Sequence, residues 1–432
     1  MDSTAGIRLD ISGTEAFLPA ADLDGLAGPV TAAAAELAAG TGPGSDFLGW
    51  LDLPARIGEA ELAAVEAAAA RLRGLADCCV VVGIGGSYLG ARAVLEALGG
   101  PAPGAPELLF AGTGLCPATL GRVLDRVAQR EPALCVISKS GTTLEPAVAF
   151  RLLRADLERR YGARAAERIV AITDARRGAL KTMADEQGYA TFVVPDDVGG
   201  RFSVLTPVGL VPLAVAGVDI RALVDGARAM RAACAAPDLR ANPAHLYAAV
   251  RHALYRRGFT IEVLSSFHGG LGQVAEWWKQ LFGESEGKGG QGIFPASTVM
   301  TTDLHSLGQY LQDGRRCIQE TFLTVDRTRP EIAVPAGGAD GRDLDGLDYL
   351  AGMPLDEINR RAFAGTRAAH LAGGVPCTAL ALETVDARSV GALLYLFEKA
   401  VAVSGRLLGV NPFDQPGVEA YKKEMFRLLG KR

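Results

Sequence analysis

The sequence has no long hydrophobic run and only five histidines. Its longest apolar stretch, residues 204–218, is broken by Pro207 and Pro212 and is too short to span a bilayer. No basic segment followed by an apolar one opens the chain, so no secretory signal is expected. The seven cysteines are an odd number and include no CxxC pair, which excludes a disulfide framework or zinc ribbon and fits reduced thiols. These absences predict a cytoplasmic protein without a membrane span or a metal.

No surplus of charge points to a polyanionic partner either. The 44 basic and 49 acidic residues leave a net charge of −5, so neither nucleic acid nor an anionic membrane is an expected partner. Hydrophobic residues make up 49% of the chain, which is ordinary for a globular protein. A length of 432 residues allows two or three domains with generous cores.

Short apolar runs alternate with helical patterns between residues 59 and 194. Strands are expected at 78–82, 108–111, 134–137, 169–172 and 191–194. Helices are expected at 59–75, 90–98, 117–127, 144–160 and 177–186. Continuous apolar strands that alternate with helices predict a parallel sheet covered on both faces, which is an α/β fold.

A second alternating block begins near Gly258. Its expected strands are 260–264, 317–325 and 377–382, and its expected helices are 270–282, 304–311, 354–371, 389–408 and 417–429. Helices at 220–236 and 243–255 join the blocks. The first 60 residues show one helical pattern, at 29–39, and are expected to serve packing or oligomerisation rather than chemistry.

Two turns that follow predicted strands could bind an anion. The segment GIGGSYLGAR (83–92) places Gly85, Gly86 and Ser87 where a helix opens, so that free backbone N–H groups face outward. A dinucleotide fingerprint would need glycine where Tyr88 stands. A tight turn that only packs strand against helix is the alternative.

The second turn, SKSGTTLE (138–145), offers several hydroxyl groups. Its lysine precedes the glycine, unlike a P-loop, and the hydroxyls with backbone donors suit a phosphate monoester bound without magnesium. The alternative is a helix N-cap, which would need only one hydroxyl. Because both turns would meet at the carboxyl edge of one sheet, they favour a phosphorylated small molecule. The residues concerned are Ser138, Lys139, Ser140, Thr142 and Thr143.

Charged residues elsewhere could act on such a molecule. Arg201 follows two glycines and precedes a strand-like apolar run, so it could approach a ligand, although an ion pair with Asp196 or Asp197 is favoured from that segment alone. Glu284 follows a helix that Gly283 is expected to end, and the negative end of the helix dipole should make its carboxylate a better base. Spacing cannot decide between Glu284 and Glu286.

A histidine and a lysine complete the candidate set. His305 is expected in the first turn of a helix that Thr302 or Asp303 caps, where the positive helix end favours neutral imidazole. Lys422 falls within the apolar stripe of the last helix, formed by Val418, Met425, Phe426 and Leu429, which favours a site-lining lysine over one that snorkels to solvent. His245 and His252 share a helix face but have no third ligand, so no metal site is predicted.

Together these segments resemble the glucose-6-phosphate isomerase family in its shorter bacterial form. The resemblance rests on GIGGSYLGAR, VISKSGTTLEPA, DDVGGRFSVLTPVGL, EWWKQLFGESEGK, TTDLHSLGQ and NPFDQPGVEAYKK, which span residues 80–424. It implies two sugar-isomerase (SIS) domains, each an α/β/α sandwich, at 61–221 and 222–432, with residues 1–60 as an N-terminal extension. It also implies a homodimer.

The resemblance further implies a role for each candidate residue. Glu284 would move a proton between sugar C2 and C1, and Arg201 would stabilise the enediolate. His305, from the partner subunit, and Lys422 would open the ring, while the two turns would bind phosphate beside Gln415. Interconversion of glucose 6-phosphate and fructose 6-phosphate is redox-neutral, so no cofactor is expected.

A sugar-phosphate sensor that binds without turnover is the alternative function. It would not need Glu284, His305 or Lys422, yet all three are present. The sequence departs from the family pattern in two places. Gly289 and Gly290 stand where more polar residues are expected, and the first 60 residues match no known segment.

Overall fold

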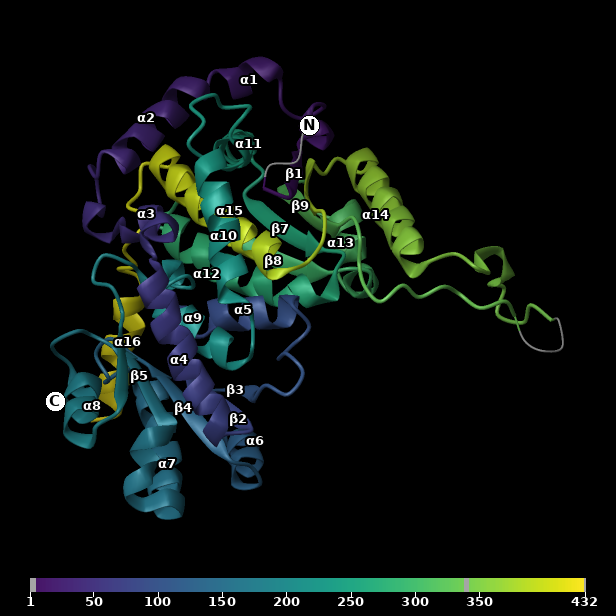
Figure 1. The fold of residues 1–432 in the computed structure, drawn as a ribbon. Coiled ribbons are helices and arrows are strands. Elements are labelled where there is room, and N and C mark those ends of the chain that lie inside the picture. The colour runs from purple at the N-terminus through teal and green to yellow at the C-terminus, as the bar shows by residue number, and fades with distance from the viewer. Residues whose placement is uncertain (1–4, 338–341, 431–432) are drawn as a thin grey trace.

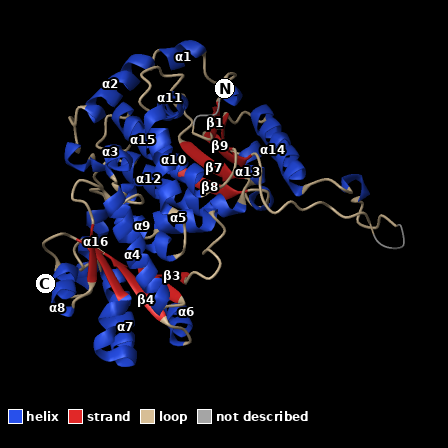
Figure 2. Cartoon of the chain, viewed as in Figure 1, coloured by secondary structure: helices blue, strands red, loops and turns tan. Residues whose placement is uncertain are grey.

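The chain folds around two five-stranded sheets, each flanked by helices (Figures 1 and 2). The computed structural model describes residues 5–337 and 342–430. The first sheet has the order β3-β2-β4-β5-β6, and all its strands are parallel. These strands are β2 (Cys78–Val82), β3 (Glu107–Ala111), β4 (Pro132–Ile137), β5 (Ile169–Thr173) and β6 (Ala190–Val193).

Helices cover both faces of this sheet, as the continuous apolar strands predict. Every residue of β2 and β4 is buried, which requires cover on both sides. The strand order reverses between β2 and β4, because β3 lies on one side of β2 and the later strands lie on the other. Ligands bind at such switch points in open α/β folds. The helices are α4 (Glu59–Leu75), α5 (Leu89–Ala97), α6 (Pro117–Ala128), α7 (Leu144–Tyr161), α8 (Ala179–Gln187) and α9 (Pro207–Val215).

The second sheet has the order β1-β10-β9-β7-β8 and is parallel except for β1, which pairs antiparallel with β10. Its strands are β1 (Ile7–Asp10), β7 (Ile261–Ser266), β8 (Phe294–Val299), β9 (Ile318–Val325) and β10 (Cys377–Leu382). Strands β1 and β8 are additions to the predicted set, because residues 1–60 were expected to hold only a helix and no strand was expected between residues 264 and 317. Each occupies an edge of the sheet.

One helix is the centre of the packing around this sheet. Helix α15 (Ala387–Leu407) is buried from Ser389 to Gly405 on every side, and it packs against α10 (Ile220–Ala233), α11 (Pro243–Arg256) and α12 (Gly272–Glu286). A helix that is buried on every side belongs in such a core, and here even Glu398 and Lys399 are buried. The remaining helices are α1 (Ala20–Asp24), α2 (Ala27–Ala38), α3 (Gly49–Arg56), α13 (Gly308–Asp313), α14 (Leu355–Ala372) and α16 (Val418–Leu428).

The apolar run after Arg201 forms a helix, so the expectation of a strand there was wrong. Helix α9 begins at Pro207, and Thr206 caps it by accepting a hydrogen bond from the Val208 N–H at 3.2 Å. A proline at the first helical position and a threonine cap are strong start signals for a helix. They outweigh the β-branched residues of this segment.

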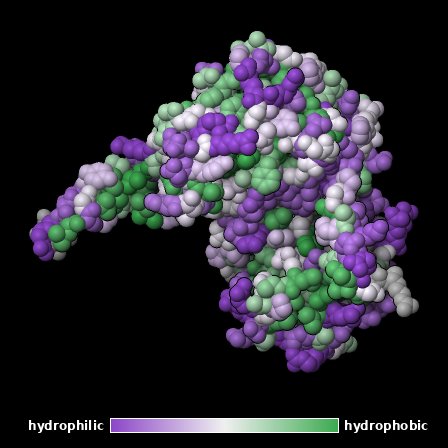
Figure 3. Space-filling model, turned by 180° about the vertical axis from the view of Figure 1, so that it is seen from behind, coloured by the Kyte–Doolittle hydropathy of each residue, from purple (hydrophilic) through white to green (hydrophobic). Residues whose placement is uncertain are grey.

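An arm, residues 327–337 and 342–354, projects from the second sheet between β9 and α14 (Figure 1). Its two sides meet at the base, where Ala333 bridges to Pro354. Large apolar side chains on the arm are exposed to solvent, among them Leu344 at 79% and Tyr349 at 75%. Seen from behind, the arm shows hydrophobic as well as hydrophilic surface (Figure 3). An exposed apolar surface of this kind is typical of a contact region.

The two histidines of α11 lie in the core. His245 is buried, and neither of its ring nitrogens has a hydrogen-bond partner. Desolvation, with a smaller contribution from the nearby Lys399, lowers the pKa of His245 to about 4. Among the described residues, no group of three or more His, Cys, Asp or Glu side chains could hold a metal ion.

This burial predicts a pH-dependent loss of stability. An unfolded histidine has a pKa near 6.5, whereas that of folded His245 is about 4, so the unfolded chain takes up the proton first as the pH falls. The free energy of unfolding should therefore fall between these two values, by up to about 3 kcal/mol from this residue. In a His245→Leu variant, the free energy of unfolding measured with urea should fall less over this pH range than in wild type. The same fall in both proteins would show that His245 does not cause it.

Candidate active site

A cavity of about 920 Å³ opens at the carboxyl edge of the first sheet, where the strand order reverses. Its walls come from segments far apart in the sequence: the turns after β2 and β4, residues 198–201, one face of α12, and the C-terminal segment that ends in α16. Its size is typical of a small-molecule site. Most of the residues predicted for the site line this cavity.

The turn after β2 is a 3-10 helix, Gly85–Ser87, that leads into α5. A Cβ atom on Gly86 would lie 2.1 Å from the carbonyl oxygen of Gly200, so glycine is needed there for the Gly200–Arg201 backbone to approach. Gly85 has a positive φ of 56°, which also favours glycine. The glycines of this turn therefore place Arg201 against it.

The turn after β4 presents its hydroxyls at the same edge. The Ser138 hydroxyl accepts a hydrogen bond from the Gly141 N–H at 2.9 Å, and the Ser140 hydroxyl accepts one from the Thr142 N–H at 3.2 Å. Thr143 stands at the N-cap of α7 without a side-chain capping bond, so capping does not account for these hydroxyls. Lys139 forms an ion pair with Asp196 at 2.6 Å.

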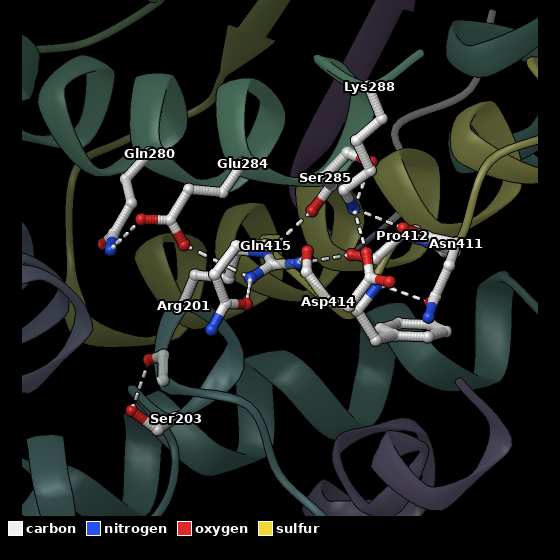
Figure 4. A network of polar contacts seen from close by, with 12 residues as sticks. Arg201, Ser203, Gln280, Glu284, Ser285, Lys288, Asn411, Pro412, Asp414 and Gln415 are labelled. Carbon is white, nitrogen blue, oxygen red and sulfur yellow. Dashed lines mark hydrogen bonds and ion pairs between the residues drawn. The ribbon is translucent and has the colours of Figure 1, made fainter. Parts of the chain in front are cut away.

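Arg201 is buried at the base of the cavity, and all five of its N–H donors have a partner (Figure 4). Its Nη1 lies 3.2 Å from Glu284 Oε2 and 3.0 Å from Gln415 Oε1. The other donors reach Ser285 Oγ at 2.8 Å and the carbonyl oxygens of Pro412 at 2.6 Å and Asp414 at 3.1 Å. This network fixes the guanidinium rigidly.

The favoured alternative for Arg201, an ion pair with Asp196 or Asp197, was wrong. Asp196 pairs with Lys139, and Asp197 pairs with Arg56 at 3.6 Å. Desolvation lowers the pKa of Arg201, while the Glu284 carboxylate opposes that shift. The arginine therefore brings a positive charge to the cavity rather than to its own loop.

Glu284 lies in the last turn of α12, because the helix continues to Glu286 instead of ending at Gly283 as expected. Both carboxylate oxygens are held: Arg201 binds Oε2, and Gln280 Nε2 donates to Oε1 at 3.0 Å. Gln280 also lines the cavity and was not predicted. Its spacing of four residues from Glu284, which places two side chains on one helix face, was the available signal.

Glu286, the competing acid, points into the core. Arg251 Nη1 lies 2.6 Å from Glu286 Oε1, and the same guanidinium also contacts Glu262. Side chains two positions apart on a helix point about 200° apart, so only one of these acids can face the cavity. That acid is Glu284.

Helix α16 closes one side of the cavity with its half-buried face, formed by Val418, Lys422, Met425 and Phe426. The predicted stripe is thus present in part, since Leu429 lies beyond the helix and is exposed. Lys422 forms an ion pair with Glu419 at 2.7 Å, and its side chain is 38% exposed. No residue of α16 is buried.

His305 is not among the residues that line the cavity. It is the last residue of a 3-10 helix, Thr302–His305, after β8, and its side chain is exposed. The expected position in the first turn of a helix was wrong, because α13 begins only at Gly308. Asp303 instead accepts a hydrogen bond from the Val299 N–H at 2.7 Å.

None of the helices in the described ranges, 5–337 and 342–430, is long and apolar enough to cross a membrane. Comparison with known families finds a match to the phosphoglucose isomerase model over residues 69–328 and 356–430. The unmatched interval between these ranges coincides with most of the arm.

Individual relatives match over nearly the whole chain. A glucose-6-phosphate isomerase of Symbiobacterium thermophilum is 56% identical over 90% of this chain and 88% of its own. A glucose-6-phosphate isomerase of Shouchella clausii is 50% identical over 99% of this chain and 96% of its own. Among solved structures, a hypothetical protein from Thermus thermophilus has 29% identity and a TM-score of 0.89 over 98% of this chain and 99% of its own.

Proposed function

Because the chain belongs to the phosphoglucose isomerase family, we propose that it interconverts glucose 6-phosphate and fructose 6-phosphate as an aldose–ketose isomerase. The observation that carries this proposal is the Glu284 carboxylate, which faces the cavity with Arg201 on one oxygen and Gln280 on the other. The hydroxyl-rich turn after β4 lines the same cavity. A base, a cation and a phosphate site are what this reaction requires.

In the proposed mechanism, Glu284 removes the proton from C2 of the open-chain aldose. The C–H electron pair becomes the C1–C2 double bond, and the carbonyl electron pair moves to O1, which gives the enediolate. A proton then passes from the C2 hydroxyl to O1. Glu284 then returns its proton to C1 while C2 becomes the carbonyl carbon. One carboxylate serves both carbons, and the reaction needs no electron acceptor.

Arg201 stabilises the enediolate by its fixed positive charge. Its donors are already held by protein groups, so the guanidinium does not need to reorganise during the reaction. Gly85, Gly86, Ser87 and the Ser138–Thr143 turn bind the phosphate, and Gln415 contacts the substrate beside them. Lys422 assists His305 in opening the sugar ring.

The proposed enzyme is a homodimer in which the partner subunit supplies His305. Support comes from the exposed position of His305 outside its own cavity, and from the exposed apolar side chains Leu307 and Tyr310 beside it. The apolar arm provides further surface for a second copy of the chain. A cytoplasmic location suits an enzyme of glycolysis and gluconeogenesis.

Two SIS-type domains, at 61–221 and 222–432, form each proposed subunit. Residues 1–60 act as an extension whose strand β1 adds to the sheet of the second domain. In this proposed arrangement, Glu284 belongs to the second domain and the phosphate turns belong to the first, and both line the same cavity.

Mixed dimers test the shared site. Glu284→Gln and His305→Ala should each be nearly inactive alone, because each lacks one group at every site. Co-expressed, they should recover about a quarter of wild-type activity, since half of randomly formed dimers would hold one complete site. Glu284→Gln mixed with Arg201→Lys is the control. Glu284 and Arg201 reach a site from the same subunit, so each site of the mixed dimer lacks one of them. Equal activity in the two mixtures would contradict a partner-supplied histidine.

The proposed activity itself is tested by a coupled assay. Fructose 6-phosphate should be converted to glucose 6-phosphate, detected by a nicotinamide-linked dehydrogenase specific for the product. Tight binding of fructose 6-phosphate without any product would contradict the proposal and indicate a sensor.

A further inference from the structure

The segment Asn411–Gln415 connects the buried core to the cavity. It begins just after α15, delivers Gln415 to Arg201, and leads into α16 with Lys422. Phe413 anchors it by packing against Trp50 and Phe202. Because no residue of α16 is buried, the position of that helix depends largely on the segment that precedes it.

Two cations hold the backbone of this segment. Arg201 donates to the carbonyl oxygens of Pro412 and Asp414. Lys288 donates to the carbonyl oxygen of Asn411, and its Nζ lies 3.0 Å from Asp414 Oδ1 (Figure 4). The third donor of the ammonium reaches the Ser285 carbonyl oxygen at 3.2 Å.

Lys288 is thus fully engaged by protein groups. Its side chain is only 13% exposed, and it does not line the cavity. An ammonium group has three donors, and all three have partners here. It therefore has no free donor for a substrate, and the mechanism proposed above does not use it.

The contacts of Lys288 connect the two sides of the active site. Lys288 lies two residues beyond the end of α12, the helix that carries Glu284. Ser285 joins the two cations, since its hydroxyl accepts from Arg201 and its carbonyl oxygen accepts from Lys288. The base, the arginine and the segment Asn411–Gln415 are thereby held in one network.

We propose that Lys288 is a positioning residue that fixes Gln415 and, through α16, Lys422 relative to Glu284. This inference rests on the proposed isomerase activity. Loss of the ammonium would remove the protein donor to the Asn411 carbonyl and the Asp414 carboxylate and would allow the segment to shift. A displacement of about 1 Å in a catalytic group lowers rates on the order of 10²-fold.

Kinetics of a Lys288→Met variant test the proposal. We expect kcat to fall on the order of 10²-fold, with KM changed by less than about threefold, because the phosphate turns lie on another sheet. Lys288→Arg keeps the charge and the donors and should restore most of the rate. Lys279→Met is the matched control, since Lys279 lies on α12 but pairs only with Glu276 at the surface.

Amide hydrogen exchange supplies a second measurement that does not depend on activity. Residues 411–428 should exchange at least about tenfold faster in Lys288→Met than in wild type, while β2 and β4 remain protected. Asp414→Asn should produce the same two changes in milder form, even if Lys288→Met does not fold. An unchanged kcat or an unchanged exchange rate at 411–428 would overturn the proposal. If the wild-type protein showed no isomerase activity but residues 411–428 still exchanged faster in Lys288→Met, only the proposed function would be refuted.

Discussion

Replacing Glu284 with Gln is expected to lower kcat by about 10²–10⁴-fold, the range that a general base contributes. The amide has nearly the shape of the carboxylate and can stay between Arg201 and Gln280, but it cannot take a proton from carbon. Steady-state kinetics measure the loss, and calorimetric titration with fructose 6-phosphate should show that binding is retained.

Glu276→Gln is the matched control for this variant. Glu276 lies on the same helix two turns earlier and pairs with Lys279 outside the cavity. Its activity should remain within about twofold of wild type, as for most surface substitutions. If Glu284→Gln also retained full activity, another group would have to be the base.

Replacing Arg251 with Met is expected to destabilise the protein by about 3–5 kcal/mol. Arg251 is 1% exposed, and its two carboxylate partners, Glu262 and Glu286, are both fully buried. Removal of the cation would leave two charges of the same sign in the core. Urea unfolding measures the loss.

Arg126→Met offers a comparison at the surface. Arg126 pairs with Glu107 at 2.9 Å, but its side chain is 51% exposed, so its loss should cost less than about 1 kcal/mol. A similarly small cost for Arg251→Met would mean that the buried pair does not stabilise the end of α12.

The same buried pair explains why the sequence predicted the end of α12 wrongly. Gly283 is a normal signal for a helix end, and local propensity favours a stop there. However, Arg251, which lies on α11, donates a hydrogen bond to Glu286 and so stabilises the last turn of α12. Spacing within one segment cannot reveal such a partner.

Strands could be predicted where every residue is buried. They could not be predicted where the strand forms only by pairing with a neighbouring strand at the edge of the sheet. The bounds predicted for β2 and β10 match the structure, and both are buried at every position. β1 has only four residues and forms against β10, more than 360 residues away. β8 contains Pro295 and begins with an exposed phenylalanine, so its sequence resembles a loop.

The cavity was predictable because its residues fall in characteristic turns. Both strand-to-helix turns could be placed at one sheet edge from topology alone, whereas the segment of Arg201 favoured an ion pair within its own loop. Gln280 and Lys288 could not be identified in this way, because their relevance depends on contacts with Glu284 and with residues 411–414. His305 lies apart from the cavity of its own chain, and the spacing of residues in the sequence could not predict this.

The central claim, proton transfer by Glu284, is tested most directly by isomerisation of fructose 6-phosphate in D2O. Nuclear magnetic resonance of the glucose 6-phosphate product should show deuterium at C2 with the wild-type protein. At equal enzyme concentration, the Glu284→Gln variant should form C2-deuterated product at least about 10²-fold more slowly. Deuterium at C2 formed by this variant at the wild-type rate would contradict the account.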